Sequence, residues 1–145
     1  MKHQQPFIGA YLLLIKNNQL LLEKRLGGIL NGKYTPIAGH TESGETVIDA
    51  IIREAKEEAD INLKADDLEV KVIIQRPSAQ YKGTPTDIID FFIFAENYSG
   101  EISNKEPEKC SEIAFYPLNN LPKDTLPHVK KAVQAYFDGQ CFLVC

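Results

Sequence analysis

The stretch GHTESGETVIDAIIREAKEEADI, residues 39–61, begins as a turn and continues as an amphipathic helix. Thr46 has the side chain of a helix N-cap, and Asp49 stands three residues later in the capping-box position. From Ile48 onward, apolar residues recur at spacings of three and four, which is the pattern of a helix with one buried face. We therefore predict a helix from about Thr46 to Ala59.

The predicted helix also carries three carboxylates, Glu54, Glu57 and Glu58. Residues three and four apart share a face of a helix, so these side chains converge although like charges repel. Carboxylate oxygens are hard ligands that suit Mg²⁺ or Mn²⁺, and a glycine turn lets a backbone carbonyl approach a cation closely. By themselves, however, three glutamates are more typical of a solvated acidic face, so the choice depends on the rest of the chain.

The composition of the chain is that of one globular domain, which we place at residues 1–145. The 145 residues are 43% hydrophobic and 25% charged, which is ordinary for a chain that buries a core. The net charge of −4 argues against a long nucleic-acid partner, because duplex binding relies on many Lys and Arg residues. A small phosphorylated ligand is still compatible with this charge, since a few local cations or a metal can neutralise it.

The chain carries few signals of location. No apolar run reaches the length of a membrane span, and the first residues, MKHQQPF, lack the apolar segment of a signal peptide. The three cysteines, Cys110, Cys141 and Cys145, are too few and too irregular for a disulfide framework. We therefore expect reduced thiols, a cytoplasmic location and no membrane partner.

The other segments predict several strands and a second helix. Apolar, β-branched and aromatic residues predict strands at 7–15, 20–25, 34–38, 68–75, 87–95 and 111–116. The segment 76–86 contains two prolines and a glycine and is predicted to be a loop. A last helix should begin near Thr125, with Pro127 in its first turn, and end at Gly139. This order of elements is typical of an α+β fold with helices packed against a mixed sheet.

The spacing within the opening stretch resembles the Nudix box. Its constrained positions are Gly39, Glu45, Arg53, Glu54, Glu57, Glu58 and Ile61. Two flanking segments, PIAGH at residues 36–40 and NKEPEKC at residues 104–110, are also similar to MutT-like members of the family. The resemblance extends from about Phe7 to Phe137 and implies a Nudix α/β/α sandwich with a central mixed β-sheet.

Two positions depart from the family pattern. Ala55 stands where a larger aliphatic residue is usual, which alters packing only. Asp60 stands where the family has a glycine after the helix. That position often needs a left-handed backbone, which costs Asp roughly 1 kcal/mol more than Gly. The departure therefore bears on local stability and leaves every expected ligand in place.

The resemblance implies a divalent-metal site built mainly from the helix. Glu57 and Glu58 would bind the metal, and Glu54 would bind it directly or through water, or act as the general base. A backbone carbonyl of Gly39, or of the neighbouring Ala38, would contribute from the turn.

The resemblance also assigns roles outside this group. Many MutT-like members recruit another carboxylate from the loop before the late strand, where Glu106 fits best and Glu108 is the alternative. Glu45 and Arg53 would form an ion pair that braces the turn against the helix, a structural role.

Three further residues are candidates for substrate contact. Arg25, at the end of the second strand, could bind a phosphate, although a plain surface cation is an equal alternative. Tyr81, in the predicted loop, could stack on a base, although a packed or exposed tyrosine is more common there. Asp124 falls where MutT-like enzymes often place a side chain that reads the base.

The function implied by the resemblance is Mg²⁺-dependent hydrolysis of a pyrophosphate bond, with Mn²⁺ as a possible substitute. The expected substrate is a nucleoside triphosphate or a related nucleoside diphosphate derivative. ADP-ribose, nucleotide sugars and dinucleoside polyphosphates are alternative substrates, because the box binds only the pyrophosphate. A domain that senses nucleotides without turnover is the alternative from another class, and the retained carboxylates argue against it. We expect a monomer or a homodimer.

Overall fold

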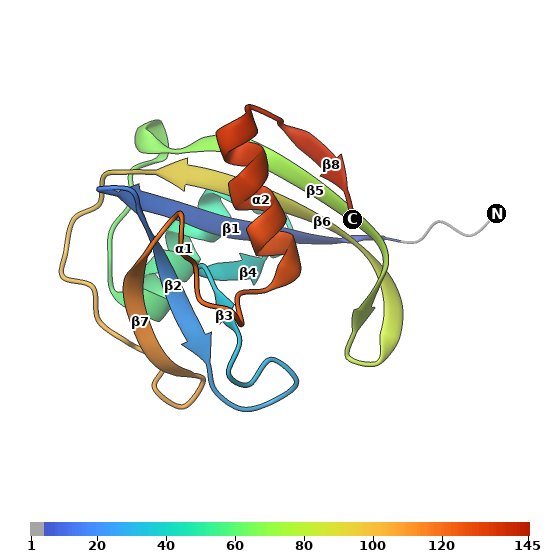
Figure 1. Ribbon diagram of the computed structural model, residues 1–145, viewed down its shortest axis with the longest axis horizontal. Helices are drawn as coiled ribbons and strands as arrows, with labels where there is room; N and C mark the ends of the chain where they lie inside the picture. Colours follow the sequence, from blue (N-terminus) through green and yellow to red (C-terminus); the bar gives the residue numbers. More distant parts are fainter. Residues whose placement is uncertain (1–4) are drawn as a thin grey trace.

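The computed structural model describes residues 5–145, so the expectation drawn from MKHQQPF lies partly outside the described residues. The elements are β1 (Phe7–Lys16), β2 (Gln19–Arg25), β3 (Tyr34–Thr35), β4 (Ala38–His40), α1 (Val47–Ala59), a 3₁₀ turn (Ala65–Asp67), β5 (Glu69–Tyr81), β6 (Thr84–Ala95), β7 (Cys110–Pro117), α2 (Pro127–Asp138) and β8 (Phe142–Val144). Within this range eight strands form one sheet, with α1 and α2 on opposite faces (Figure 1). The predicted α/β/α sandwich is confirmed. Neither helix of residues 5–145 is long and apolar enough to cross a membrane.

The sheet is mixed, and β1 joins its parts. β1 pairs in parallel with β6 and antiparallel with β2 and β4. β2 also pairs with β3 and β7, and β5 pairs with β6 and, in parallel, with β8. Because β4 precedes α1, its pairing with β1 brings the turn before the helix to the middle of the sheet.

Side-chain alternation along β1 and β2 gives the sheet two buried faces. Leu12 and Leu21 pack in the core that contains the buried residues of α1. Leu13 and Leu22, one residue further along each strand, pack in the core that contains those of α2. The apolar runs at residues 12–15 and 20–22 are typical of strands covered on both faces.

The first helix begins and ends as predicted. The Thr46 hydroxyl accepts a hydrogen bond from the Asp49 N–H over 3.0 Å, and the Asp49 carboxylate accepts one from the Thr46 N–H over 3.2 Å, which completes the capping box. At the other end, Asp60 adopts the left-handed conformation with φ 58° and ψ 33°. Its carboxylate pairs with Lys56 over 2.8 Å.

The prediction of a loop at 76–86 is wrong. β5 and β6 run almost the whole way and form one long hairpin, closed by a turn at Lys82 and Gly83 with φ of 50° and 79°. Two consecutive positive φ values match the twist of a hairpin. The pairing is irregular between Arg76 and Ala79, and Ser78 has a φ of 54°. The irregularity accommodates a proline that cannot donate to the ladder.

Two smaller differences also come from tertiary pairing. The strand predicted at 34–38 is divided into β3 and β4, because Pro36 has no N–H and the Ile37 carbonyl instead accepts a hydrogen bond from the Leu12 N–H over 2.9 Å. The short strand β8 was not predicted, and its three residues are paired only because the chain returns alongside β5. The last helix begins at Pro127 and has Gly139 as its left-handed C-cap, as expected.

Candidate active site

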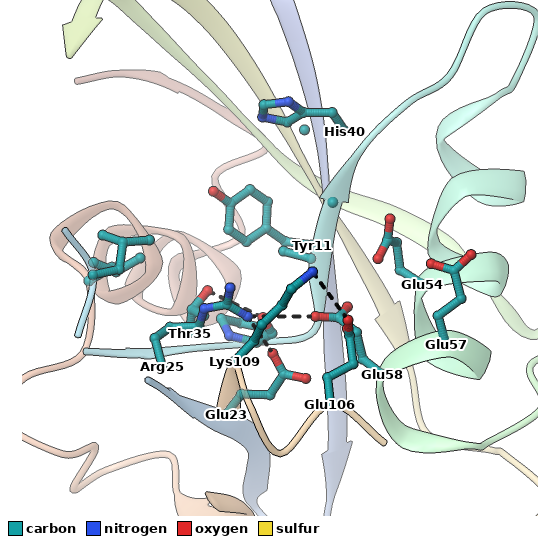
Figure 2. Close-up of a pocket in the computed structure, with 16 residues that line it drawn as sticks. Tyr11, Glu23, Arg25, Thr35, His40, Glu54, Glu57, Glu58, Glu106 and Lys109 are labelled. Atoms are coloured by element: carbon teal, nitrogen blue, oxygen red, sulfur yellow. Dashed lines mark hydrogen bonds and ion pairs between the residues drawn. The ribbon is translucent and has the colours of Figure 1, made fainter. Parts of the chain in front are cut away.

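A pocket of about 410 Å³ lies beside α1, where β1, β2 and β4 meet the loop before β7 (Figure 2). Charged side chains supply much of its lining. They are five glutamates and two cations: Glu23, Glu54, Glu57, Glu58, Glu106, Arg25 and Lys109. The fold thus brings together carboxylates from a strand, a helix and a loop that are distant in the sequence.

Arg53 ties the turn before α1 to the helix. Its Nε and Nη2 donate to the two carboxylate oxygens of Glu45 over 2.8 and 2.9 Å, and Nη2 also donates to the His40 carbonyl over 3.2 Å. Its Nη1 donates to the Glu54 carboxylate over 2.7 Å. Hydrogen bonds from Arg53 lower the pKa of Glu45 to about 2, because they favour the charged carboxylate. The pair therefore occupies the bracing position that the resemblance implies, and Arg53 also orients Glu54.

Gly39 of β4 lies directly against Glu54. A β-carbon at residue 39 would overlap the Glu54 carboxylate, so a glycine is needed for this close approach. Gly39 and Ala38 both line the pocket. The backbone of β4 is therefore close to the helical carboxylates, as a carbonyl ligand would require.

The three glutamates of α1 differ in their exposure. Glu58 is 6% exposed and Glu54 is 15% exposed, whereas Glu57 is 56% exposed. Burial raises the pKa of Glu58 well above its usual range, and the nearby carboxylates of Glu23 and Glu54 raise it further. Burial also raises the pKa of Glu54. The helix therefore presents a concentration of negative charge that is costly unless a cation accompanies it.

Glu23 of β2 also belongs to this pocket, although the sequence reasoning did not include it. Its side chain is 2% exposed, and burial raises its pKa. The two-residue alternation of a strand could have indicated its direction, because Leu21 and Glu23 are two residues apart and so share a face of β2. Leu21 packs in the core on the α1 side. Glu23 therefore points toward the carboxylate helix rather than into solvent.

Two cations lie among these carboxylates. Arg25 Nη1 is 3.7 Å from a carboxylate oxygen of Glu23 and 3.9 Å from one of Glu58. Lys109 Nζ is 3.6 Å from the Glu106 carboxylate. Both cations line the pocket, so positive charge is available beside the acidic group for a phosphate.

The loop before β7 places Glu106 at the pocket. The Lys105 N–H donates to the Glu58 carbonyl over 3.1 Å, which fastens this loop to the end of α1. The Glu106 N–H donates to the Asn104 side chain over 3.1 Å. Glu106 lines the pocket, whereas Glu108 is exposed and lies outside that lining as residues 5–145 form it. Of the two alternative carboxylates, Glu106 is therefore in position.

Tyr81 lies near the pocket, but in a strand and not in the predicted loop. It is the last residue of β5 rather than part of a loop. Its ring centroid is 4.7 Å from that of Phe7 and 5.3 Å from that of His40. His40 lines the pocket, so Tyr81 reaches the site through an aromatic neighbour.

Asp124 stands at the edge of the site. Its side chain is 58% exposed and pairs with Lys33 over 4.0 Å. Its backbone carbonyl accepts a hydrogen bond from the Tyr34 N–H over 3.0 Å. Leu126 lines the pocket, while Asp124 is not in direct contact with it in the described part of the chain. A bound molecule would have to extend past Leu126 to reach Asp124.

The wall contributed by β1 and β4 is less charged. Tyr11 and His40 lie on this side of the pocket (Figure 2). The Tyr11 hydroxyl and His128 Nε2 are hydrogen-bonded over 2.9 Å. Burial lowers the pKa of His128 to about 3, so this ring is neutral near pH 7. The pocket thus combines a charged part with a neutral, aromatic part.

The acidic part fits a hard divalent cation. Buried side-chain oxygens of Glu23 and Glu58 have no hydrogen-bond partner, and carboxylates are the ligands that Mg²⁺ prefers. Across residues 5–145, no three Asp, Glu, His or Cys side chains are arranged closely enough to enclose a metal by themselves. A Mg²⁺ ion here would therefore need water and phosphate oxygens as further ligands, which is how it is usually bound.

Comparisons with known proteins place the chain in one family. The model of the NUDIX domain matches residues 5–137. The chain is 30% identical over 125 residues to an ADP-ribose pyrophosphatase from Methanocaldococcus jannaschii, which covers 86% of this chain and 70% of the relative. It is 32% identical over 107 residues to the NAD-capped RNA hydrolase NudC of Vibrio parahaemolyticus, covering 74% of this chain and 37% of that protein.

The fold is also similar to solved structures. A MutT NUDIX hydrolase from Burkholderia pseudomallei superposes with a TM-score of 0.80 at 21% identity, over 90% of this chain and 98% of the other. A MutT protein from Bacillus halodurans superposes with a TM-score of 0.75 at 18% identity, over 95% and 86% of the two chains. The match of the domain model to residues 5–137, together with the relative from Methanocaldococcus jannaschii, shows that the chain belongs to the Nudix hydrolase family.

Proposed function

We propose that this protein hydrolyses a pyrophosphate bond in a nucleoside triphosphate or a related nucleoside diphosphate derivative, and that the reaction depends on Mg²⁺, which Mn²⁺ can replace. The observation that carries the proposal is the convergence of Glu54, Glu57 and Glu58 on one pocket, where a Glu58 oxygen is buried without a partner. Arg53 compensates Glu54. Arg25, however, remains 3.9 Å from Glu58 and leaves its buried oxygen without a partner, which favours a further cation at this position.

The residues divide into those that would hold the metal and those that position them. Glu57 and Glu58 would be ligands, with a backbone carbonyl of Gly39 or Ala38 and the carboxylate of Glu106 as further ligands. When bound, the metal would offset the charge of the pyrophosphate and so favour attack by water.

Glu54 has two candidate roles in this scheme. Its carboxylate is oriented by the 2.7 Å hydrogen bond from Arg53, which in turn is fixed by Glu45. An oriented carboxylate can bind the metal or accept a proton from the attacking water. Arg53 and Glu45 support both roles by holding the turn and the helix together.

The substrate would lie across the two parts of the pocket. Arg25 and Lys109 would contact phosphate oxygens, since both are cations of the lining. The nucleoside would then extend along the neutral wall at Tyr11 and His40. Tyr81 lies beyond His40 as its aromatic neighbour. Asp124 lies at another edge of the pocket, where its side chain could accept a hydrogen bond from a base.

Hydrolysis of ADP-ribose is the second candidate function. The observation that favours it is the 30% identity to the ADP-ribose pyrophosphatase of Methanocaldococcus jannaschii. ADP-ribose contains the same pyrophosphate group, so the acidic part of the pocket suits either substrate. The difference would lie at the end of the pyrophosphate away from the nucleoside, where the site must hold a second ribose in place of a terminal phosphate.

A substrate panel would test the function. The purified protein is incubated with Mg²⁺ and each common nucleoside triphosphate, ADP-ribose, a nucleotide sugar or a dinucleoside polyphosphate, and products are separated by chromatography. Glu57→Gln should lower kcat by about a hundredfold or more, and chelation should abolish turnover. Glu69→Gln, at a 67% exposed residue of β5, removes the same charge away from the pocket and should have no effect.

Each alternative has its own result in this panel. A preference for ADP-ribose over every triphosphate would favour the second candidate. Binding of nucleotides without hydrolysis of any substrate would identify a sensing domain instead. Full activity of Glu57→Gln, or full activity after thorough chelation, would contradict the proposed use of a metal.

The proposal extends to the setting of the protein. The net charge of −4 favours small nucleotides over long nucleic acid as substrates. We expect one domain over residues 1–145 that acts in the cytoplasm as a monomer or a homodimer.

A further inference from the structure

Glu23 is the most deeply buried carboxylate of the pocket, and the proposed function does not yet assign it a role. It lies on β2 with 2% exposure, on the face that meets α1, and Glu58 lies opposite with 6% exposure (Figure 2). An acidic side chain inside a strand covered on both faces is unusual, since Asp and Glu are rarely buried unless they are paired.

The hydrogen bonds of this pair are incomplete. Glu23 Oε2 and Glu58 Oε2 are both buried, and neither has a hydrogen-bond partner. The nearest cation is Arg25, whose Nη1 is 3.7 Å from Glu23 Oε2 and 3.9 Å from Glu58 Oε1. Both distances exceed the range of a hydrogen bond. One guanidinium thus faces two carboxylates and satisfies neither.

Fold stability does not explain this arrangement. An apolar residue at position 23 would continue the run of Leu20, Leu21 and Leu22 and would avoid the cost of a buried charge. Two buried carboxylates, each with a free oxygen, instead supply what a small divalent cation needs: hard oxygen ligands that are already dehydrated.

We propose that Glu23 is a ligand of the divalent cation, so that β2 and α1 each supply one buried carboxylate through Glu23 and Glu58. This inference rests on the proposed function, because it concerns the same metal. A cation shared by these two carboxylates would replace Arg25 as their counter-charge. Arg25 would then be available to contact a phosphate of the substrate.

A purely positional role for Glu23 is the main alternative. In that case Glu23 only orients Arg25 toward the substrate, and the metal is held by α1 alone. The two roles differ most in the absence of substrate, because the loss of a ligand removes a bond to the metal, whereas the loss of a residue that orients Arg25 removes only a nearby charge.

Binding of Mn²⁺ to the substrate-free protein separates these roles. Free Mn²⁺ is followed by electron paramagnetic resonance during titration of the wild type, Glu23→Gln, Glu57→Gln and Glu69→Gln. We expect Glu23→Gln to raise the Kd for Mn²⁺ at least about tenfold, as the loss of a metal-site group commonly does. Glu69→Gln removes an equal charge from an exposed position and should leave the Kd within about twofold, because surface charges act weakly at a distance.

Thermal unfolding supplies the second measurement. Mn²⁺ should raise the Tm of the wild type and of Glu69→Gln, and should raise that of Glu23→Gln much less at the same concentration, because a ligand stabilises only the state that binds it. The glutamine variant is isosteric and loses a buried charge, so it should fold. If it does not, Glu23→Met, which has a similar volume and no charge, is measured in its place.

The outcomes distinguish this inference from the proposed function. Wild-type affinity for Mn²⁺ in Glu23→Gln, together with weakened affinity in Glu57→Gln, would overturn the role of Glu23 and leave the proposed function standing. No binding of Mn²⁺ to the wild type would instead contradict the proposed metal dependence. An unchanged Kd for Mn²⁺ with a raised KM in Glu23→Gln would show that Glu23 only positions Arg25.

Discussion

Replacing Glu58 with glutamine should change activity and stability in opposite directions. Glu58 is 6% exposed, its Oε2 lacks a partner, and Arg25 Nη1 is 3.9 Å from its other oxygen. Without metal, ionisation of this buried carboxyl is only partly compensated, so the folded state keeps it protonated at a pH where the unfolded chain is already ionised. Glutamine keeps the shape, removes the ionisable group and offers N–H donors to the carboxylate of Glu23. We expect the free energy of unfolding in metal-free buffer at pH 8 to rise by about 1–2 kcal/mol.

The size of this gain should depend on pH. Burial raises the pKa of Glu58 in the folded state above its value in the unfolded chain, so the folded state holds this proton more tightly. At a pH below the unfolded pKa, the carboxyl is protonated in both states and costs nothing. As the pH rises, the unfolded chain ionises first, so the stability of the wild type falls. The difference between Glu58→Gln and the wild type should therefore be small at acidic pH and widen toward pH 8.

Urea unfolding in the presence of EDTA, followed by circular dichroism at several pH values, measures the stability change. For a domain of this size, 1 kcal/mol corresponds to roughly 3–4 °C in Tm, so thermal scans can check it. With Mg²⁺ and the best substrate, kcat of Glu58→Gln should fall by about a hundredfold or more, because a group that stabilises the transition state is lost. The control is Glu69→Gln, which should match the wild type in both assays.

Two results would refute this reasoning. If Glu58→Gln were less stable than the wild type at pH 8 without metal, the carboxylate would be needed for the fold. If its turnover were close to that of the wild type, Glu58 would not bind a metal that the reaction needs.

Three further predictions concern the turn, the helix end and the substrate. Gly39→Ala should lower kcat by about tenfold or more while the protein still folds, because the added methyl group overlaps the Glu54 carboxylate and displaces it. A wild-type kcat would show that β4 and α1 can move apart enough to accept the methyl group without displacing Glu54. Asp60→Gly should raise the free energy of unfolding by roughly 0.5 kcal/mol, since glycine adopts the left-handed backbone at lower cost and the exposed ion pair with Lys56 contributes little. A lower Tm would mean that this ion pair stabilises the protein more than the left-handed backbone of Asp60 destabilises it. If Asp124 reads the base, Asp124→Ala should cost the best nucleotide roughly 1–3 kcal/mol in kcat/KM and poor ones much less; a uniform loss across nucleotides, or none, would remove that role.

Local sequence determined the first helix and the placement of its carboxylates. The capping box at Thr46 and the convergence of three glutamates follow from spacings of a few residues along one chain segment, and the left-handed end at Asp60 was implied by the glycine that the Nudix pattern has there. A helix has one period, so its faces can be read directly from the sequence. The ion pair of Glu45 and Arg53, which the resemblance to the Nudix box implied, is also present in the structure.

Only the tertiary structure decided which distant residues complete the pocket. Whether a residue of β2 faces α1, α2 or solvent depends on how the strands pair. A shift of one residue in the pairing register would move each side chain to the opposite face of the sheet. Glu23 therefore looked like an ordinary strand residue until the pairing of β1 with β2 set its direction. The long β5–β6 hairpin has the same cause, since a segment with two prolines becomes a strand only where a partner supplies the hydrogen bonds. Sequence periods describe a single element, whereas the direction of a strand's side chains and the pairing of its backbone depend on neighbours that are far away in the chain.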